Sequence, residues 1–393
     1  MKQSGAFLTR PMLVVTVALV GLNLRPFITS IGPLIANIRT ATGLSLQGMA
    51  LLTLLPMMLM GIVAFVGPIL QNFIGERSAI LGALLTICAG CAFRFLFPIA
   101  EGLILSAIVI GFGVAMIQAA FPGMIKREFS QHIGPMMGLY SAMLMGGGAL
   151  GAWLAPVVSN ITGLWSIGLA FFAIPALFAF ILALAFLPAK ASTSIHRAPV
   201  RKLLKQPRTW LLMACFGLVN GGYSSVVAWL APSFQDHGWS AAQSGKLLAL
   251  LALSQAASAL ILPVLARKYK DRRPWLWFTL AMQMVGFLGI AFMPEFAAML
   301  WAICLGVGLG GCFALTLIVA LDHFDEPIHA GVLSALMQGG GFLLAAIPPW
   351  IIAILHDLTG AYKAGWLFHL ANVILVVILV IRLAPKSYFK LGL

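Results

Sequence analysis

Charged residues are scarce in this chain of 393 residues: Asp, Glu, Lys and Arg make up 9% of it, and apolar residues 61%. A soluble globular domain carries about 25% charged residues, so this composition excludes one. The apolar runs are about twice as long as membrane β-strands and do not alternate with period two, which leaves helices as the spanning element. We predict an all-α membrane protein of about twelve transmembrane helices, with lipid as its surroundings.

The apolar segments are separated by short polar or glycine- and proline-containing connections. The predicted spans are residues 12–35, 47–71, 78–98, 102–125, 136–158, 164–187, 209–231, 243–265, 275–293, 297–320, 330–354 and 364–383.

Acidic residues are the scarcest charged class, and all ten lie in connections or at span ends. They are Glu76, Glu101, Glu128, Asp236, Asp271, Glu295, Asp322, Asp325, Glu326 and Asp357. A cation inside a span therefore has no carboxylate partner at the same depth.

Cysteine is rare too: the five present give no disulfide framework. Cys88 and Cys91 form an isolated CxxC inside a span, and Gly306-x-Gly308-x-x-Gly311 lies inside an apolar helix rather than after a strand. No histidine is spaced from an acid as catalysis requires. We expect no enzyme, no metal and no cofactor.

The net charge of +14 is distributed unevenly along the chain. With both termini cytoplasmic, the tails and inner connections hold nineteen of the 24 Lys and Arg residues, and the outer connections hold Arg39 and Lys363 alone. This is the positive-inside pattern of a multi-pass membrane protein, and it orients the chain. The charge thus reflects topology, with no nucleic-acid partner expected.

The sequence contains an internal repeat at an offset of about 195 residues. Gly111 and Gly113 recur as Gly306 and Gly308, and the glycine triplet 146–148 recurs as 339–341. Repeats of this kind are typical of secondary transporters. We predict a six-helix half over residues 1–187, a basic cytoplasmic linker over 188–208 and a second half over 209–393.

Arg25 is the strongest local signal, because it lies in the middle of the first span before Pro26. A cation at the bilayer centre costs about 2.5–3.5 kcal/mol on the lenient scale and almost always faces a cavity or a partner. Pro26 removes one backbone donor and favours a bent helix. Neutralisation by helix carbonyls is the alternative, but we favour a substrate contact. The substrate is then anionic, or neutral with acceptor oxygens such as a nitro group.

Other polar and aromatic residues inside spans complete the predicted binding site. They are Asn23, Thr29, Gln118, Phe121, Tyr140, Asn220, Tyr223, Trp229, Gln255 and Gln338. Asn23 and Asn220 occupy comparable positions in the two repeats, which favours a pair near the midplane. Each residue alone is more commonly a helix–helix hydrogen bond. Arg94 and Lys246 lie nearer their span ends, where they either reach the surface or line the cavity.

Two short charged connections occupy equivalent positions, Glu76-Arg77 and Asp271-Arg272. They resemble the gating loop of the major facilitator superfamily, and our hypothesis is that charge pairs there bias the outward-facing state.

The whole chain resembles that superfamily, and the run Gly21-Leu-Asn-Leu-Arg25-Pro26 resembles its cyanate permease branch. The resemblance implies the major facilitator fold, with two parallel six-helix repeats around a cavity lined mainly by spans 1, 4, 7 and 10. It also implies a bacterial inner-membrane location and efflux of 2-nitroimidazole-type molecules, with uptake or exchange of an anion such as cyanate as the alternative. We expect a monomer.

Proton coupling is left open by the sequence. Proton-driven members commonly carry a membrane-embedded acid, which this chain lacks. An antiporter would need an ionising substrate, His369 or Asp322 as the proton carrier, whereas a facilitator or exchanger fits the sequence equally well.

Overall fold

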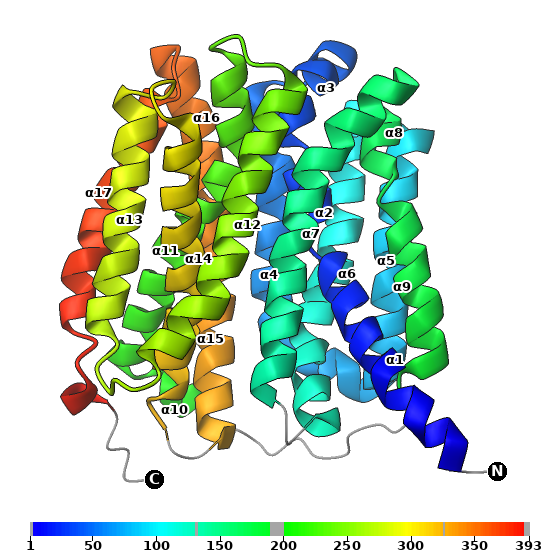
Figure 1. Cartoon of the computed structure of the whole chain (residues 1–393), viewed down its shortest axis with the longest axis vertical. Coiled ribbons are helices and arrows are strands. Elements are labelled where there is room, and N and C mark those ends of the chain that lie inside the picture. Colours follow the sequence, from blue (N-terminus) through cyan, green and yellow to red (C-terminus); the bar gives the residue numbers. More distant parts are fainter. Residues whose placement is uncertain (1–2, 130–132, 189–199, 325–326, 389–393) are drawn as a thin grey trace.

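The helices form two bundles that stand side by side, one from each half of the chain (Figure 1). The computed structural model describes residues 3–129, 133–188, 200–324 and 327–388. Within these ranges the secondary structure is helical, with no strand. Both termini lie at the same end of the bundles, here called the termini end, and the opposite end is called the far end (Figure 1).

The longer helices run between these two ends. In chain order, the α-helices are α1 Gln3–Leu22, α2 Pro26–Thr29, α3 Ile35–Thr42, α4 Leu46–Ile74, α5 Glu76–Leu96, α6 Ala100–Glu128, α7 Ile133–Thr162, α8 Trp165–Ala170, α9 Ala173–Phe186, α10 Val200–Leu204, α11 Pro207–Gln235, α12 Ala241–Ala266, α13 Arg273–Phe292, α14 Ala298–Leu321, α15 Pro327–Ala346, α16 Pro348–Thr359 and α17 Lys363–Ile381. The 3-10 helices are η1 Gly32–Leu34 and η2 Pro385–Ser387.

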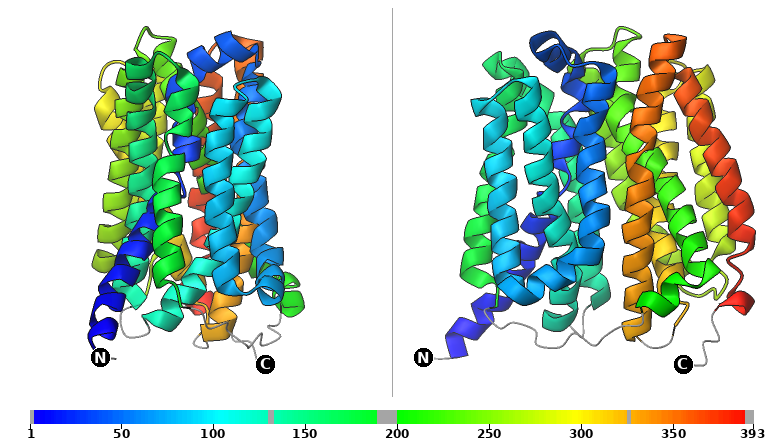
Figure 2. Two further views of the ribbon diagram at one scale, coloured as in Figure 1. Left: turned by 90° about the vertical axis from the view of Figure 1, so that its right-hand side faces the viewer. Right: turned by 180° about the vertical axis from the view of Figure 1, so that it is seen from behind.

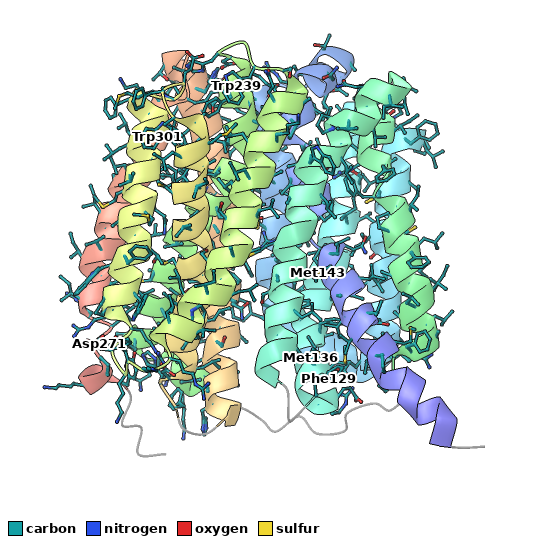
Figure 3. All side chains as sticks on the ribbon, in the orientation of Figure 1. Phe129, Met136, Met143, Trp239, Asp271 and Trp301 are labelled. Carbon is teal, nitrogen blue, oxygen red and sulfur yellow. The ribbon has the colours of Figure 1, made fainter. Side chains whose placement is uncertain are left out.

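Among the described residues, 12 helical segments are long and apolar enough to cross a membrane. This confirms the predicted all-α fold with about twelve spans. Span 1 consists of α1 to α3, span 6 of α8 and α9, and span 11 of α15 and α16. Trp239 and Trp301 both lie near the far end (Figure 3), as tryptophan commonly does at a membrane–water boundary.

The two halves repeat the same packing. In the first half α4 and α5 pack on α6, and in the second half α12 and α13 pack on α14. The halves meet through α7 against α12 and α4 against α15, which are the same two positions with the halves exchanged. Figure 2 shows from behind how α4 and α15 stand at the boundary between the bundles. Helices at equivalent positions of the two repeats therefore make the same contacts, both inside each half and at the boundary between the halves.

The first span is broken, as the position of Pro26 predicts. Helix α1 ends at Leu22, and α2 begins at Pro26. Pro26 has no N–H to donate to the Leu22 carbonyl four residues earlier, so the helical ladder stops there. A Cβ atom on Gly147 of α7 would stand 1.9 Å from that carbonyl oxygen. The first glycine triplet therefore lets α7 approach the backbone at the break.

A second proline break separates α15 from α16. Pro349 cannot donate to the Ala345 carbonyl, which instead accepts a hydrogen bond from Ser224 Oγ of α11 at 2.6 Å. The glycine triplet 339–341 lies at this contact, and a Cβ on Gly341 would stand 2.4 Å from the Phe216 side chain. Both repeats thus combine a proline break with a glycine triplet. In the first half the break lies on span 1 and the triplet on span 5, whereas in the second half both lie on span 11.

Most of the predicted linker, residues 189–199, lies outside the described residues. Its remainder forms the short helix α10, and α11 begins at Pro207, one residue before the predicted end of the linker.

Candidate functional site

A small cavity lies between the two halves, beside the break in the first span. Its volume is about 20 Å³, little more than one water molecule needs. Its lining comprises Arg25, Leu144, Met145, Val219, Asn220, Tyr223, Gln255, Leu309, Gly310 and Phe313. Three of these belong to the first half and seven to the second, so the site depends on both.

Arg25 enters this cavity from the non-helical turn between α1 and α2. The residue is 5% exposed, and its guanidinium carbon lies 4.6 Å from the centroid of the Tyr223 ring on α11. Such a cation–π contact contributes about 0.5–2 kcal/mol. Its Nε and Nη1 atoms are buried without a hydrogen-bond partner among the described residues. No Asp or Glu of the described chain is buried, so the guanidinium has no neighbouring carboxylate.

Three more residues of the predicted site reach the same cavity: Tyr223, Asn220 and Gln255. The Asn220 amide donates to the Phe216 carbonyl at 2.8 Å, a bond within its own helix. Gln255 is 4% exposed on α12. The cavity therefore joins one cation, one aromatic ring and two amides within a mainly apolar wall.

Asn23, Thr29 and Trp229 do not line this cavity, and their polar atoms bond to backbone. The Asn23 amide donates to the carbonyls of Leu19 and Pro175, at 2.8 and 3.1 Å, so the expected midplane pair with Asn220 does not form. Thr29 donates within its own turn. The Trp229 indole donates to the Pro349 carbonyl at 2.8 Å. These three residues stabilise breaks and helix contacts.

The other predicted residues also lie outside the cavity lining. Phe121 packs against Tyr140 with ring centroids 5.5 Å apart, and the Tyr140 hydroxyl is buried without a partner among the described residues. Gln338 lies within hydrogen-bond reach of Ser334, at 3.5 Å. Gln118, on α6, is only partly buried. Spans 1, 7 and 10 line the cavity, as the family resemblance implies. Span 4 does not, and spans 5 and 8 contribute lining residues in its place.

Sequence reasoning missed the apolar wall of the cavity, including Met145, Leu309 and Phe313. Helices that are apolar on every face give no signal for which residues turn toward the interior. The sequence also left Arg94 and Lys246 undecided. Lys246 is exposed, whereas Arg94 is 1% exposed and bonded inside the first half.

The far end is closed above this cavity by contacts between the halves. Gln235 of α11 donates to the Pro33 carbonyl at 2.9 Å, and Gln47 of α4 donates to Asp357 at 3.2 Å. A Cβ on Gly32 would lie 3.1 Å from the Val227 carbonyl oxygen. A surface cavity of about 490 Å³ lined by Arg39, Asp236 and Tyr362, among others, lies outside this closure.

The predicted gating-loop residues form ion pairs within each half at the termini end. Glu76 pairs with Arg127 at the end of α6, at 2.5 Å, and Arg272 pairs with Asp322 at the end of α14, at 3.1 Å. Arg77 donates to the Leu184 carbonyl instead. Asp271, labelled in Figure 3, pairs with Arg273 at 2.7 Å, and hydrogen bonds from Arg273 lower the pKa of the Asp271 carboxyl.

A buried histidine lies beside the second of these pairs. His323 directs Nδ1 to the Val319 carbonyl at 2.5 Å and receives a hydrogen bond from Arg208 Nε at its Nε2, at 3.0 Å. The Tyr388 ring stacks on it, with centroids 4.1 Å apart. This network requires the neutral imidazole. Burial, together with Arg208, lowers the pKa of His323 to about 4.

His369, the other histidine considered as a proton carrier, is 1% exposed inside the second half. Its ring stacks on Phe287, with centroids 5.4 Å apart, and it does not border the cavity.

Comparison with known proteins identifies related sequences along the whole chain. The family description of the Major Facilitator Superfamily matches residues 13–349 and 234–391. The cyanate transport protein CynX of Escherichia coli (strain K12) is 43% identical over 383 residues, covering 97% of this chain and 99% of the relative. The 2-nitroimidazole transporter of the same organism is 32% identical over 362 residues, covering 90% of both chains.

Solved structures share the fold at low sequence identity. The D-xylose–proton symporter superposes with a TM-score of 0.78 at 13% identity, covering 96% of this chain and 98% of that one. A bacterial homolog to the human lysosomal transporter Spinster, in its inward-facing and unoccupied conformation, gives a TM-score of 0.77 at 16% identity, covering 98% and 99%.

Proposed function

Because the chain belongs to the major facilitator superfamily and is a multi-pass membrane transporter of small molecules, we propose that it carries a small monovalent anion such as cyanate. Arg25 binds this anion, and the two halves expose the site to each side of the membrane in turn. The observation that carries the proposal is the buried guanidinium, whose Nε and Nη1 have no partner among the described residues.

The charge of the site favours an anion over a cation or a sugar. A buried cation without a counter-ion is costly, and an anion offers both the missing charge and hydrogen-bond acceptors. The nearest ring, Tyr223, presents its electron-rich face to the guanidinium but supplies no full negative charge. Binding of an anion therefore offsets the free-energy cost of the buried, unpaired guanidinium in the empty site.

The size of the cavity favours a substrate of few atoms. At about 20 Å³, the closed site must widen to admit either substrate, and a linear triatomic anion requires less widening than a substituted five-membered ring. The relative that is 43% identical over nearly the whole chain is a cyanate transport protein, which agrees with this argument.

A nitro-bearing heterocycle is the second candidate substrate. Its nitro oxygens can accept hydrogen bonds from Arg25, and the Tyr223 ring offers a surface for stacking. The relative at 32% identity is a 2-nitroimidazole transporter. Efflux by antiport belongs to this second candidate, with the termini end cytoplasmic, where most Lys and Arg residues of the sequence lie.

Counterflow in proteoliposomes tests the substrate without assuming a direction or a coupling ion. Vesicles loaded with unlabelled cyanate should accumulate labelled cyanate transiently, and 2-nitroimidazole should compete weakly. Arg25→Gln should abolish counterflow, and Arg25→Lys should leave a small fraction because one ammonium cannot reproduce the guanidinium fork. Lys246→Gln removes an exposed cation within a span and serves as the matched control.

Two results would redirect the proposal. Wild-type counterflow by folded Arg25→Gln protein would remove Arg25 from the site. Counterflow of 2-nitroimidazole without cyanate exchange would establish the second candidate, and a pH gradient across everted vesicles would then test efflux by antiport.

A further inference from the structure

A second arginine is buried in the first half, outside the cavity. Arg94 lies in the last turn of α5 and is 1% exposed. It does not border the cavity of Arg25, and no salt bridge joins it to an acid of the described chain. Burying a guanidinium without a counter-ion is costly, so its hydrogen bonds must account for its position.

Arg94 connects two spans to the broken one. Its Nη1 donates to the Phe27 carbonyl at 3.0 Å, and its Nε donates to Ser106 Oγ of α6 at 3.1 Å. The Ser106 hydroxyl in turn donates to the Leu103 carbonyl at 2.6 Å, which fixes its orientation. Ser106 is fully buried. The guanidinium is thus anchored on α6 and directed at α2.

The Phe27 carbonyl needs this donor because α2 is so short. In a continuous helix the Ile31 N–H would donate to Phe27, but here it donates to Ile28 at 3.2 Å. Phe27 itself is 1% exposed, and a buried carbonyl without a donor costs about 1–3 kcal/mol. A charged donor makes a stronger bond than a neutral one, so Arg94 is well suited to hold the distorted turn.

We propose that Arg94 is a positioning residue for Arg25: it fixes the α2 turn through the Phe27 carbonyl, two residues from Arg25, and so sets where the substrate-binding guanidinium enters the cavity. This inference rests on the proposed role of Arg25 in binding. Arg94 would thus affect substrate binding although it does not line the cavity and forms no salt bridge with a described acid.

Three substitutions separate the bond to Phe27 from the bond to Ser106. Arg94→Lys keeps a donor long enough to approach the Phe27 carbonyl, Arg94→Gln ends near the position of Nε and can reach only Ser106, and Arg94→Met has no donor. Hydrogen–deuterium exchange of the peptide spanning residues 23–31 reports on the turn without any substrate. We expect exchange to rise at least fivefold in Arg94→Met and Arg94→Gln and to stay near wild type in Arg94→Lys.

Transport provides the second readout. If the turn positions Arg25, Arg94→Met should raise the KM for cyanate about tenfold in counterflow while the maximal rate per folded molecule changes less than twofold. Arg94→Lys should recover most of the KM. A purely structural role would lower the folded yield and the rate together and leave KM unchanged, and this result would overturn the proposal.

The two proposals fail in different ways. Unchanged exchange over residues 23–31 in folded Arg94→Met protein overturns the positioning role, whatever the substrate is. If wild-type protein transports neither cyanate nor 2-nitroimidazole, the proposed substrates fail, and the exchange experiment still decides whether Arg94 holds the turn.

Discussion

The Arg25 guanidinium lies over the Tyr223 ring, 4.6 Å from its centroid, and the two residues belong to opposite halves of the chain. The contact therefore spans the boundary along which the proposed transport cycle would separate the halves. A state in which the cavity opens widely must lengthen or break it. We therefore expect Tyr223 to contribute both to the site and to the stability of the closed state.

Replacing Tyr223 tests this contact. Tyr223→Phe keeps the ring face and should transport cyanate nearly as the wild type does. Tyr223→Leu removes the cation–π energy of about 0.5–2 kcal/mol, so the KM should rise about twofold to thirtyfold in counterflow. Equal KM values for the two variants would show that the ring face contributes nothing to substrate affinity.

Gly147 should tolerate no side chain, because a Cβ there would stand 1.9 Å from the Leu22 carbonyl oxygen. Backbone cannot yield as a flexible side chain can, so Gly147→Ala should lower the free energy of unfolding by at least about 1–3 kcal/mol. The adjacent Gly146 is a matched control, since a Cβ there meets nothing within 4 Å. Thermal denaturation in detergent compares the two; equal stability would contradict the close approach at the break.

The depressed pKa of His323, about 4, predicts a pH-dependent stability. Between pH 6.5 and 4 the unfolded histidine binds a proton that the native one does not, so stability rises with pH across this window. The contribution is complete above pH 6.5 and is lost as the pH falls toward 4. From pH 7 to 5 the loss is about 2 kcal/mol.

The control for this prediction is His323→Gln, which cannot titrate. Its melting temperature should fall less between pH 7 and 5 than that of the wild type. Parallel curves for both proteins would mean that burial and Arg208 do not hold His323 neutral.

The Glu76–Arg127 pair should contribute little to stability, because the Arg127 side chain is 34% exposed. A double-mutant cycle with Glu76→Gln and Arg127→Gln should give a coupling energy of about 0.2–1 kcal/mol. Glu76→Gln combined with Arg272→Gln, from the other half, should be additive. Strong coupling between the halves would instead indicate that the two gating loops act as one unit.

The sequence predicts the fold well because its signals are local. Long apolar runs predict the spans, and the distribution of the +14 net charge predicts their orientation. The repeated glycines predict two equivalent halves, and none of these signals needs tertiary information. The break at Pro26 is equally local, since a missing N–H affects a known carbonyl. Arg25 stands out because no other cation lies so centrally in a span.

The rest of the site depends on how each helix is rotated, which a uniformly apolar helix does not reveal. Trp229 and Tyr223 are six residues apart on α11, yet one bonds to Pro349 and the other lines the cavity. Arg94 donates to the Phe27 carbonyl, 67 residues away in the sequence. This carbonyl lacks a helical donor only because α2 is short. Contacts of this kind follow from packing and have no signature in the chain.

No described carboxylate is buried near Arg25, and this has an electrical consequence for the proposed transport of an anion. With the anion bound, the site has no net charge. Without the anion, the empty site carries one positive charge, and this charge moves through part of the membrane field when the carrier returns. A potential of 100 mV acts on a full elementary charge with about 2.3 kcal/mol. Membrane voltage should therefore govern the return of the empty carrier, and leave the loaded step almost untouched.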